Sequence, residues 1–315
     1  MNEPEMRDTS SRQIILLFGK VLLVLFLVFV VDRITGSAFR KYYFRQESGA
    51  GYRTTYSIDS TIAEILVFGS SRASHSYVPD IFEDSLGLSF YNTGRDGNHV
   101  LYNYALFKAI TKRYLPKIMI MDIRPEDLCT HTVEYERLSL LLPYYRTHPE
   151  IAPIIDLRGP FEKIRQLSAI YPFNSLMFQI AAGNLSFNKE RYPDIKGYVP
   201  IMKTMEDEPI DSLELENCIT DENKLSAVKD IISTCRRNNI ELVLVFSPSR
   251  SYIPDNYLYR RITLICSENG VRFLDLSNDP VFMNDHTLFA NREHLNDDGA
   301  RIFSAIVANK IRRGE

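Results

Sequence analysis

The sequence predicts an α/β protein in which a parallel five-stranded sheet carries helices on both faces. One transmembrane helix precedes the sheet, and a large insertion follows its third strand. Three observations support this prediction: an apolar run at residues 14–31, a regular alternation of short apolar segments with amphipathic ones after residue 60, and a long segment that interrupts the alternation at residues 128–221. Alternating strands and helices are typical of a parallel sheet that is covered on both sides.

The apolar run is interrupted only by Gly19 and Lys20. Its length is close to the ~20 residues that a helix needs to cross a bilayer. Lys20 lies near the start, so its ammonium can reach the nearer interface. A cleaved signal peptide is the alternative, but the run is longer than a usual signal core. The chain is therefore divided into an N-terminal tail at 1–13, a transmembrane anchor at 14–31, a polar and aromatic stalk at 32–60, and an α/β domain at 61–315 that contains the insertion.

Basic residues flank the apolar run on both sides. They are Arg7 and Arg12 before it, and Arg33, Arg40, Lys41 and Arg45 after it. The positive-inside rule, applied to this excess, favours a cytoplasmic body. We nevertheless expect a single-pass protein with its body on the extracytoplasmic side, and this expectation rests on the family resemblance described below.

Five short apolar segments read as the strands of the sheet: Ile65–Gly69, Leu88–Tyr91, Lys117–Ile123, Glu241–Phe246 and Arg272–Leu276. Helices are expected between them at His99–Arg113, around Leu225–Cys235 behind a cap at Thr220 or Asp221, at Tyr257–Asn269, and from Asn296 onward. Gly270 is a natural C-terminal glycine for the third of these helices. This pattern predicts a flavodoxin-like sheet, in which ligands bind at the carboxyl ends of the strands.

The insertion at residues 128–221 is far longer than a normal crossover and is rich in Tyr and Pro. It is expected to be partly helical near Leu138 and near Phe161–Ile170. Because it begins at the carboxyl end of the third strand, it should lean over the ligand-binding edge. It is either a substrate lid whose aromatic rings stack on sugars or a small satellite core, and the sequence does not distinguish the two.

Composition excludes several functions. A net charge of -3 gives no basic surface for nucleic acid. The four cysteines form no C-x-x-C pair, so a zinc site is not expected. Cys129 and Cys218 flank the insertion, and the sequence is compatible either with a disulfide between them or with two free thiols. The sequence shows no Walker loop, dinucleotide fingerprint or metal-ligand cluster, so no cofactor and no metal are expected.

Two distant segments carry the chemistry. Ser71 follows the first strand in a Gly-Ser-Ser turn, where its hydroxyl faces the ligand edge and its backbone N–H can face an oxyanion. His294 lies after the fifth strand and before the last helix, at the same edge. A hydroxyl needs such a base to become nucleophilic. The alternatives are a helix cap for Ser71 and a capping or surface role for His294.

Together these segments resemble the SGNH/GDSL hydrolase superfamily. Gly69-Ser70-Ser71 aligns with the nucleophile block, and the segment from His294 to Ala300 aligns with the block that carries the base. The resemblance makes Ser71 the nucleophile and His294 the base. It also assigns oxyanion-hole donors to Ser71, to Gly97 in the second block, and to Glu126 at the place of the family's asparagine. The resemblance covers residues 62–127 and 222–312 and leaves the insertion unmatched.

Three positions depart from the family pattern. Ser70 replaces the aspartate of the first block, and Glu126 replaces an asparagine that donates to the oxyanion; a carboxyl can donate only when protonated. Asn291 stands where an aspartate usually orients the base. An amide can accept a hydrogen bond from the imidazole but cannot balance its charge. Glu293 or Asp285 are alternative partners for His294.

This pattern is similar to the membrane-anchored branch of the superfamily, the alginate-type O-acetylation proteins and the D-alanyl transfer proteins of teichoic acid. The resemblance implies a membrane-anchored esterase or O-acyltransferase that acts on a bacterial envelope polysaccharide or glycopolymer. It also implies two kinds of partner, an acyl-bearing or acyl-accepting polymer and a membrane acyl-transfer protein. The alternative is a non-catalytic glycan-binding or assembly protein that keeps the fold.

Arginines follow the strands at the predicted ligand edge: Arg72, Arg95, Arg124, Arg250 and Arg292. Arginine suits bidentate recognition of carboxylate or phosphate, so the first four are predicted to bind an anionic substrate. The alternative is internal pairing with neighbouring carboxylates. His75, one helical turn after Ser71, either lines the site or has a packing role.

Overall fold

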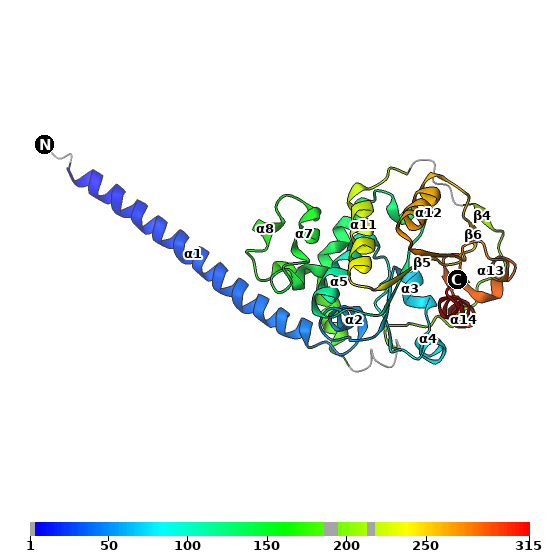
Figure 1. The fold of residues 1–315 in the computed structure, drawn as a ribbon. Helices are drawn as coiled ribbons and strands as arrows, with labels where there is room; N and C mark the ends of the chain where they lie inside the picture. Colours follow the sequence, from blue (N-terminus) through cyan, green and yellow to red (C-terminus); the bar gives the residue numbers. More distant parts are fainter. Residues whose placement is uncertain (1–3, 186–194, 213–217) are drawn as a thin grey trace.

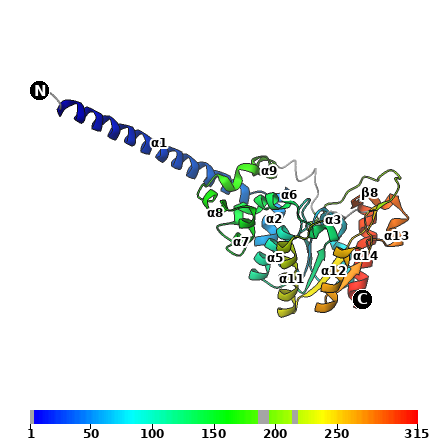
Figure 2. The same ribbon diagram turned by 90° about the horizontal axis from the view of Figure 1, so that it is seen from above.

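The structure is a computed structural model that describes residues 4–185, 195–212 and 218–315. A single long helix, α1 (Pro4–Phe44), projects from a rounded body to the N-terminus (Figures 1 and 2). Its segment Ser11–Phe44 is long and apolar enough to cross a membrane, with a mean hydropathy of 3.2 in its most apolar window and none of that window buried in the body. This is a finding of length and composition, which a signal sequence also meets.

Residues 32–60 do not form the expected stalk. They are the last turns of α1 and a second helix, α2 (Gly49–Asp59), and both pack on the body. Tyr43 and Ile58 are each 1% exposed and belong to the main core. The polar appearance of the segment is misleading because its polar groups are paired inside; the Thr54 hydroxyl, for example, lies 2.8 Å from the Tyr102 hydroxyl.

The body is built on the predicted five-stranded parallel sheet. Its strands lie in the order β2-β1-β3-β5-β7, which is the flavodoxin-like arrangement. The strands are β1 (Ile65–Phe68), β2 (Phe90–Asn92), β3 (Ile118–Asp122), β5 (Glu241–Phe246) and β7 (Arg272–Asp275). All four neighbouring pairs are parallel, so the carboxyl ends of the strands lie at one edge.

Alternate residues of each strand enter two separate cores. Leu66 and Phe68 of β1 face the larger core with α5, α11 and α12, while Ile65 and Val67 face the smaller core with α4 and α14. Figure 1 shows these two helical layers on opposite sides of the sheet. The helices are α4 (Pro79–Leu86), α5 (Val100–Arg113), α11 (Glu222–Arg237), α12 (Tyr257–Asn269) and α14 (Asp297–Arg313).

The helix termini follow the capping residues in the sequence. Asp221 accepts hydrogen bonds from the first backbone N–H groups of α11, and Asn296 accepts one from Gly299 at the start of α14. Gly270 ends α12 in the left-handed conformation, with φ 64. The side chains of Asp221 and Asn296 thus pair with backbone N–H groups that have no partner within the helix.

The insertion divides into two parts. Its first part, up to residue 185, is a helical lobe that packs against α1, α2 and α5 and joins the larger core. The helices are η1 (Pro125–Leu128), which precedes it, and then α6 (Thr132–Arg137), η2 (Leu138–Tyr144), α7 (Ala152–Ile155), η3 (Asp156–Arg158), α8 (Glu162–Arg165), η4 (Tyr171–Leu176) and α9 (Met177–Gly183). This part fits the core interpretation of the insertion rather than the lid.

The second part of the insertion returns along the ligand edge. Backbone hydrogen bonds join Lys196 to Asn92 at the end of β2, and Val199 to Ser74. The two ends of the insertion are held together by a disulfide between Cys129 and Cys218, whose Cα atoms are 5.3 Å apart. Residues 186–194 and 213–217 lie outside the described residues.

The remaining elements are short. They are α3 (Ser71–Ser76), β4 (Asp211–Ser212), β6 (Ser251–Tyr252), α13 (Pro280–Met283), η5 (His286–Leu288), β8 (Phe289–Asn291) and β9 (His294–Leu295). The antiparallel pair β8–β9 leads directly into α14 and carries the predicted base.

Candidate active site

The turn between β1 and α3 presents Ser71 at the ligand edge. Gly69 forms this turn, and any side chain there would crowd Ala73 and Asp122, whose Cβ atoms lie 2.7 and 3.0 Å from an added Cβ. Ser71 is the first residue of α3. Its backbone N–H belongs to the first turn, where helical N–H groups have no partner within the helix.

The hairpin β8–β9 brings His294 to Ser71. The Nε2 atom of His294 lies 2.6 Å from the Ser71 Oγ atom, although the two residues are 223 positions apart in the chain. On the other side of the ring, His294 Nδ1 lies 2.9 Å from Oδ1 of Asn291. Asn291, His294 and Ser71 therefore form one continuous hydrogen-bonded line.

The hydrogen-bond pattern decides which ring nitrogen carries the proton. Asn291 Oδ1 also accepts the backbone N–H groups of Glu293, at 2.9 Å, and His294, at 3.1 Å. Two backbone donors identify this atom as the amide oxygen, so Nδ1 of His294 must donate to it. Nε2 is then unprotonated and accepts the Ser71 hydroxyl proton. This is the tautomer that a serine base requires.

The carboxylates of Glu293 and Asp285 were the predicted alternatives to the Asn291 amide as the partner of His294. Glu293 instead binds Arg124, with its Oε2 atom 2.8 Å from Nη1. Asp285 accepts the Thr287 backbone N–H and hydroxyl and thereby caps η5. Neither carboxylate contacts His294 Nδ1, because the tight turn at 291–294 places the Asn291 amide there.

The environment favours the neutral form of His294. Burial lowers the pKa of His294, and nearby His75 and Arg72 lower it further, although Glu293 and Asp96 act in the opposite direction. The rings of His75 and His294 meet edge to face, with their centroids 5.5 Å apart. A neutral imidazole is the form that can accept a proton from serine.

His75 is fixed between the insertion and the second predicted block. It is 9% exposed, and its Nδ1 atom lies 2.7 Å from the Val199 carbonyl oxygen. Its Nε2 atom lies 3.3 Å from Asp96 Oδ2. Burial raises the pKa of Asp96, but the hydrogen bond and charge of His75 outweigh it and hold that pKa at about 2. The insertion thus contributes Val199 to the surroundings of His294, which sequence reasoning missed.

Two of the predicted substrate-binding arginines are buried in ion pairs beneath the site. The Arg72 Nη2 atom lies 3.2 Å from Asp127, and Arg124 Nε lies 2.7 Å from Glu126. Arg124 also reaches Glu293 in the loop that carries His294. This network ties the carboxyl ends of β1 and β3 to the His294 loop.

Arg250 is likewise occupied inside the body. Its guanidinium donates to the backbone carbonyls of Met283 and Glu208 and lies 3.4 Å from Asp207. Arg292 binds Glu208 at 2.6 Å. These contacts hold the segment before β4 against the hairpin that carries the base.

The predicted oxyanion donors lie on three different segments. Gly97 has a positive φ of 67 and sits in a turn that is closed by the Asn98 backbone N–H bound to Arg95. Glu126 follows β3, and burial together with Asp127 raises its pKa despite Arg124 and Arg72. A raised pKa favours the protonated carboxyl, which is the form that can donate a hydrogen bond. The oxyanion roles of Ser71, Gly97 and Glu126 remain predictions.

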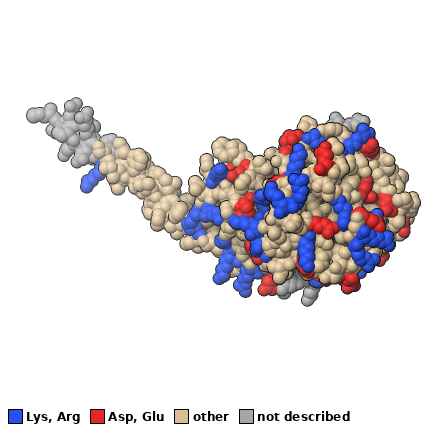
Figure 3. Space-filling view, viewed as in Figure 1, with Lys and Arg blue, Asp and Glu red and all other residues tan. Residues whose placement is uncertain are grey.

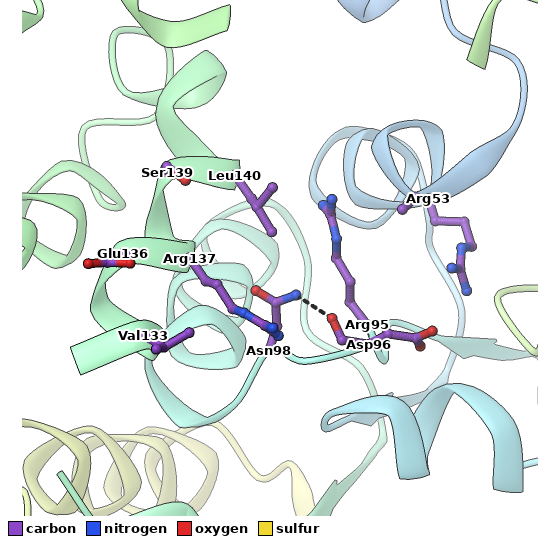
Figure 4. Close-up of a pocket in the computed structure, with 10 residues that line it drawn as sticks. Arg53, Arg95, Asp96, Asn98, Val133, Glu136, Arg137, Ser139 and Leu140 are labelled. Carbon is purple, nitrogen blue, oxygen red and sulfur yellow. Dashed lines mark hydrogen bonds between the residues drawn. The ribbon is translucent and has the colours of Figure 1, made fainter. Parts of the chain in front are cut away.

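A cavity of about 560 Å³ opens beside this site. It is lined by Ala50, Arg53, Arg95, Asp96, Asn98, Val133, Glu136, Arg137, Ser139 and Leu140. In Figure 4 the side chain of Arg137 extends from α6 toward Asn98, that of Arg95 runs from the turn after β2 toward α2, and that of Arg53 descends from α2 on the side away from Arg137. Asp96 connects this cavity to the site, because it binds His75, which contacts His294.

Arg95 differs from the other predicted arginines. In the described part of the chain, its guanidinium contacts hydroxyl and amide groups rather than a carboxylate. The Thr54 hydroxyl lies 2.5 Å from Nη1, the Gln179 amide oxygen lies 3.4 Å from Nη2, and the Tyr102 ring lies 5.7 Å from the guanidinium carbon. Arg53 and Arg137, which sequence reasoning did not select, lie on helices and follow no strand, so the strand-end argument could not find them.

No protein-family model and no curated protein matches the chain. Several solved structures are similar to it, among them the following three. A psychrotrophic esterase from Pseudoalteromonas sp. is 10% identical with a TM-score of 0.42, and the match covers 79% of this chain and 97% of that one. A putative acylhydrolase from Bacteroides fragilis is 11% identical with a TM-score of 0.38, covering 79% and 88%. An acetyl xylan esterase is 12% identical with a TM-score of 0.37, covering 79% and 98%.

Proposed function

We propose that this protein is a membrane-anchored serine esterase or O-acyltransferase. The observation that carries the proposal is the line from Asn291 through His294 to Ser71, in which the Ser71 hydroxyl lies 2.6 Å from an unprotonated Nε2. Neither a capping serine nor a surface histidine requires such a contact. The arrangement is the one that activates a serine hydroxyl.

The chemistry follows from this geometry. The Ser71 oxygen attacks an ester carbonyl while His294 takes the hydroxyl proton, and the carbonyl oxygen becomes an oxyanion. The N-terminal turn of α3 and Gly97 would stabilise that charge, and Glu126 would contribute only in its protonated form. Collapse of the tetrahedral intermediate leaves an acyl group on Ser71, and His294 gives the proton to the departing alcohol. Water or an acceptor hydroxyl then removes the acyl group by the reverse sequence.

The substrate that we propose is an acyl-bearing or acyl-accepting envelope glycopolymer with an anionic group. Arg95 supports this idea because it lines the cavity beside the site and contacts no carboxylate among the described residues. Arg72, Arg124 and Arg250 are left out because each lies within ion-pair distance of a carboxylate. Arg95 is equally buried, at 7% exposure, but its partners are the neutral groups of Thr54, Tyr102 and Gln179. An anion in the cavity would lie beside the side chains of Arg53, Arg95 and Arg137, which line it together with Asp96 and Glu136.

The body is proposed to lie on the extracytoplasmic side. The disulfide between Cys129 and Cys218 supports this side, because disulfides persist in oxidising compartments. Biotinylation of surface lysines in intact cells with an impermeant reagent tests it. Labelling only after lysis would place the body in the cytoplasm.

The decisive test is covalent labelling of the full-length protein in detergent by a fluorophosphonate, together with turnover of p-nitrophenyl acetate. The full chain is needed because Tyr43 at the end of α1 is part of the core. We expect Ser71→Ala and His294→Ala to lose both signals. Ser70→Ala is the matched control, since Ser70 is the adjacent serine, and it should keep them. Equal inertness of wild type and both variants would support the alternative of a non-catalytic glycan-binding protein.

The anionic preference is tested separately. Arg95→Met should weaken binding of an anionic glycan about 10- to 150-fold, because a charge-assisted hydrogen bond contributes roughly 1.5–3 kcal/mol. Binding of a neutral glycan should not change. Equal affinity of the wild type for both glycans would reject the anionic substrate without affecting the proposal for Ser71.

A further inference from the structure

A short turn of the insertion, between α8 and η4, is fixed to α1 where the apolar run of that helix ends. Asp32, the first residue after the run at 14–31, accepts hydrogen bonds from the Ser168 hydroxyl at 2.5 Å and from the backbone N–H of Ala169 at 2.8 Å and Ile170 at 3.2 Å. One turn later, Gly36 packs so closely on Ala169 that no side chain would fit. Arg33 donates to the Leu167 carbonyl oxygen. Residues 167–170 therefore lie at the level of α1 where a membrane-spanning segment would leave the bilayer.

The residues just before this docking point expose large apolar side chains. Phe161 is 60% exposed, Ile164 is 63% exposed and Leu167 is 71% exposed. Phe161 is the N-cap of α8 and lies three positions before Ile164, which places the two side chains next to each other on its surface, and Leu167 follows in the turn after α8. We call residues 161–167 the α8 lobe. Three neighbouring exposed apolar side chains form a patch, unlike the single ones that are normal on protein surfaces.

The α8 lobe lies near the part of α1 that would cross the membrane. In Figures 1 and 2 α8 lies at the end of the body nearest α1, on the side that faces the N-terminal half of that helix, and α12 lies on the opposite side. Lys163 and Arg165 alternate with the apolar residues of the lobe and are largely exposed. Figure 3 shows further basic side chains where α1 enters the body. Apolar side chains interleaved with Lys and Arg are typical of segments that lie in a membrane interface.

We propose that the α8 lobe inserts Phe161, Ile164 and Leu167 into the surface of the bilayer that α1 crosses. A single transmembrane helix leaves the attached body free to tilt. The lobe gives the body a second membrane contact, rigidly joined to the first through Asp32, and so fixes the orientation of the ligand edge relative to the lipid surface. The proposal requires α1 to span a membrane and does not depend on catalysis.

The test uses tryptophan fluorescence, because the chain contains no Trp. Full-length Phe161→Trp is reconstituted in vesicles of phosphatidylcholine with or without bromine near the headgroup end of the acyl chains. We expect the brominated lipid to reduce its emission about twofold, because an interfacial side chain lies ~5–10 Å into the boundary between headgroups and acyl chains. Leu167→Trp is a second reporter on the same patch and should respond in the same way.

Two further single-Trp variants are the controls. Phe26→Trp lies in the apolar run of α1 and should be quenched. Tyr257→Trp, on α12 at the far side of the body, replaces another exposed aromatic residue and should be unaffected. Melting temperatures equal to that of the wild type show that the variants are folded.

The proposal is overturned if both lobe reporters behave like Tyr257→Trp while Phe26→Trp is quenched. A blue-shifted but unquenched lobe reporter would mean that protein covers the patch, and it would also overturn the proposal. Absence of quenching in Phe26→Trp would show that α1 does not span the bilayer, and it would also overturn the proposal. Each of these results is independent of the labelling of Ser71.

Discussion

If Ser71 and His294 act as the proposed nucleophile and base, replacing Asn291 by aspartate should increase the rate of the reaction. Asn291 Oδ1 accepts three hydrogen bonds, from His294 Nδ1 and from the backbone N–H groups of Glu293 and His294. A carboxylate oxygen of nearly identical shape can accept all three. The substitution therefore keeps the ring orientation and the tautomer of His294, and adds one negative charge.

The size of the gain follows from where that charge sits. It would lie one hydrogen bond from Nδ1, which is 2.9 Å from the present amide oxygen. At about 4 Å, two unit charges attract by roughly 4 kcal/mol at an effective dielectric of 20 and by about 1 kcal/mol in water. Asn291 is exposed, so we place the stabilisation of the imidazolium at about 1–2 kcal/mol. If the transition state carries most of this charge, the rate rises about 5- to 30-fold.

The same charge changes the pH dependence of the reaction. His294 acts as a base only when neutral, and its pKa is lowered in the wild type, chiefly by burial and then by His75 and Arg72. Wild-type activity should therefore persist as the pH falls below 6.5, which is the ordinary value for histidine, and disappear only through the lowered pKa. In Asn291→Asp the carboxylate favours the imidazolium and raises this pKa, so the loss occurs at a higher pH.

The assay is the pH profile of kcat/KM for p-nitrophenyl acetate, measured for wild type, Asn291→Asp and Asn291→Ala. Asn291→Ala removes the acceptor that orients His294, and its activity should fall well below that of the wild type. The reasoning is refuted if Asn291→Asp moves the acidic limb to lower pH, or leaves both the limb and the plateau unchanged. Either result would mean that residue 291 does not face the base in the working enzyme.

Three further predictions concern the support of the site, each measured by thermal or denaturant unfolding. Cys218→Ser should lower stability by about 2–4 kcal/mol under oxidising conditions and make the melting temperature insensitive to reductant, because the bond to Cys129 closes a long loop. Lys224→Met should cost about 3–5 kcal/mol, since it leaves the largely buried Glu134 carboxylate without its partner at 2.6 Å; adding Glu134→Gln should restore part of the loss, and no restoration would contradict the pairing. Gly197→Ala should cost about 1–3 kcal/mol, because φ is 87 there and the new methyl group would meet the backbone at the end of β2; an unchanged stability would show that this part of the insertion is not held against β2.

The sequence by itself determined the main elements of the fold. The five strands, the flavodoxin-like order and the helix at Tyr257–Asn269 with its terminal Gly270 were all predicted from local patterns. Hydrophobic periodicity and capping residues act over a few positions, so they can be read without tertiary structure. The parallel topology then placed Ser71 and His294 at one edge, and the structure has them 2.6 Å apart. Their catalytic roles remain predictions.

Only the tertiary structure decided which partners the polar residues take. The arginines all follow strands, yet Arg72, Arg124 and Arg250 lie next to carboxylates. Arg95 is equally buried but contacts hydroxyl and amide groups, and it lines the cavity. The outcome depends on carboxylates that come from other strands and from the hairpin of His294. Local sequence carries no information on such distant pairs.

The same reason explains the stalk and the insertion. Residues 32–60 contain many polar side chains, and their packing partners lie on α5 and in the insertion. The hydroxyl of Thr54, for example, pairs with Tyr102, which is distant in the sequence. Val199, in the insertion, contacts His75 through its backbone carbonyl oxygen. A contact made by the backbone does not depend on the type of side chain, so the sequence does not reveal it. Short-range order is encoded by spacing, whereas the partners of buried polar groups are set by the packing of distant segments.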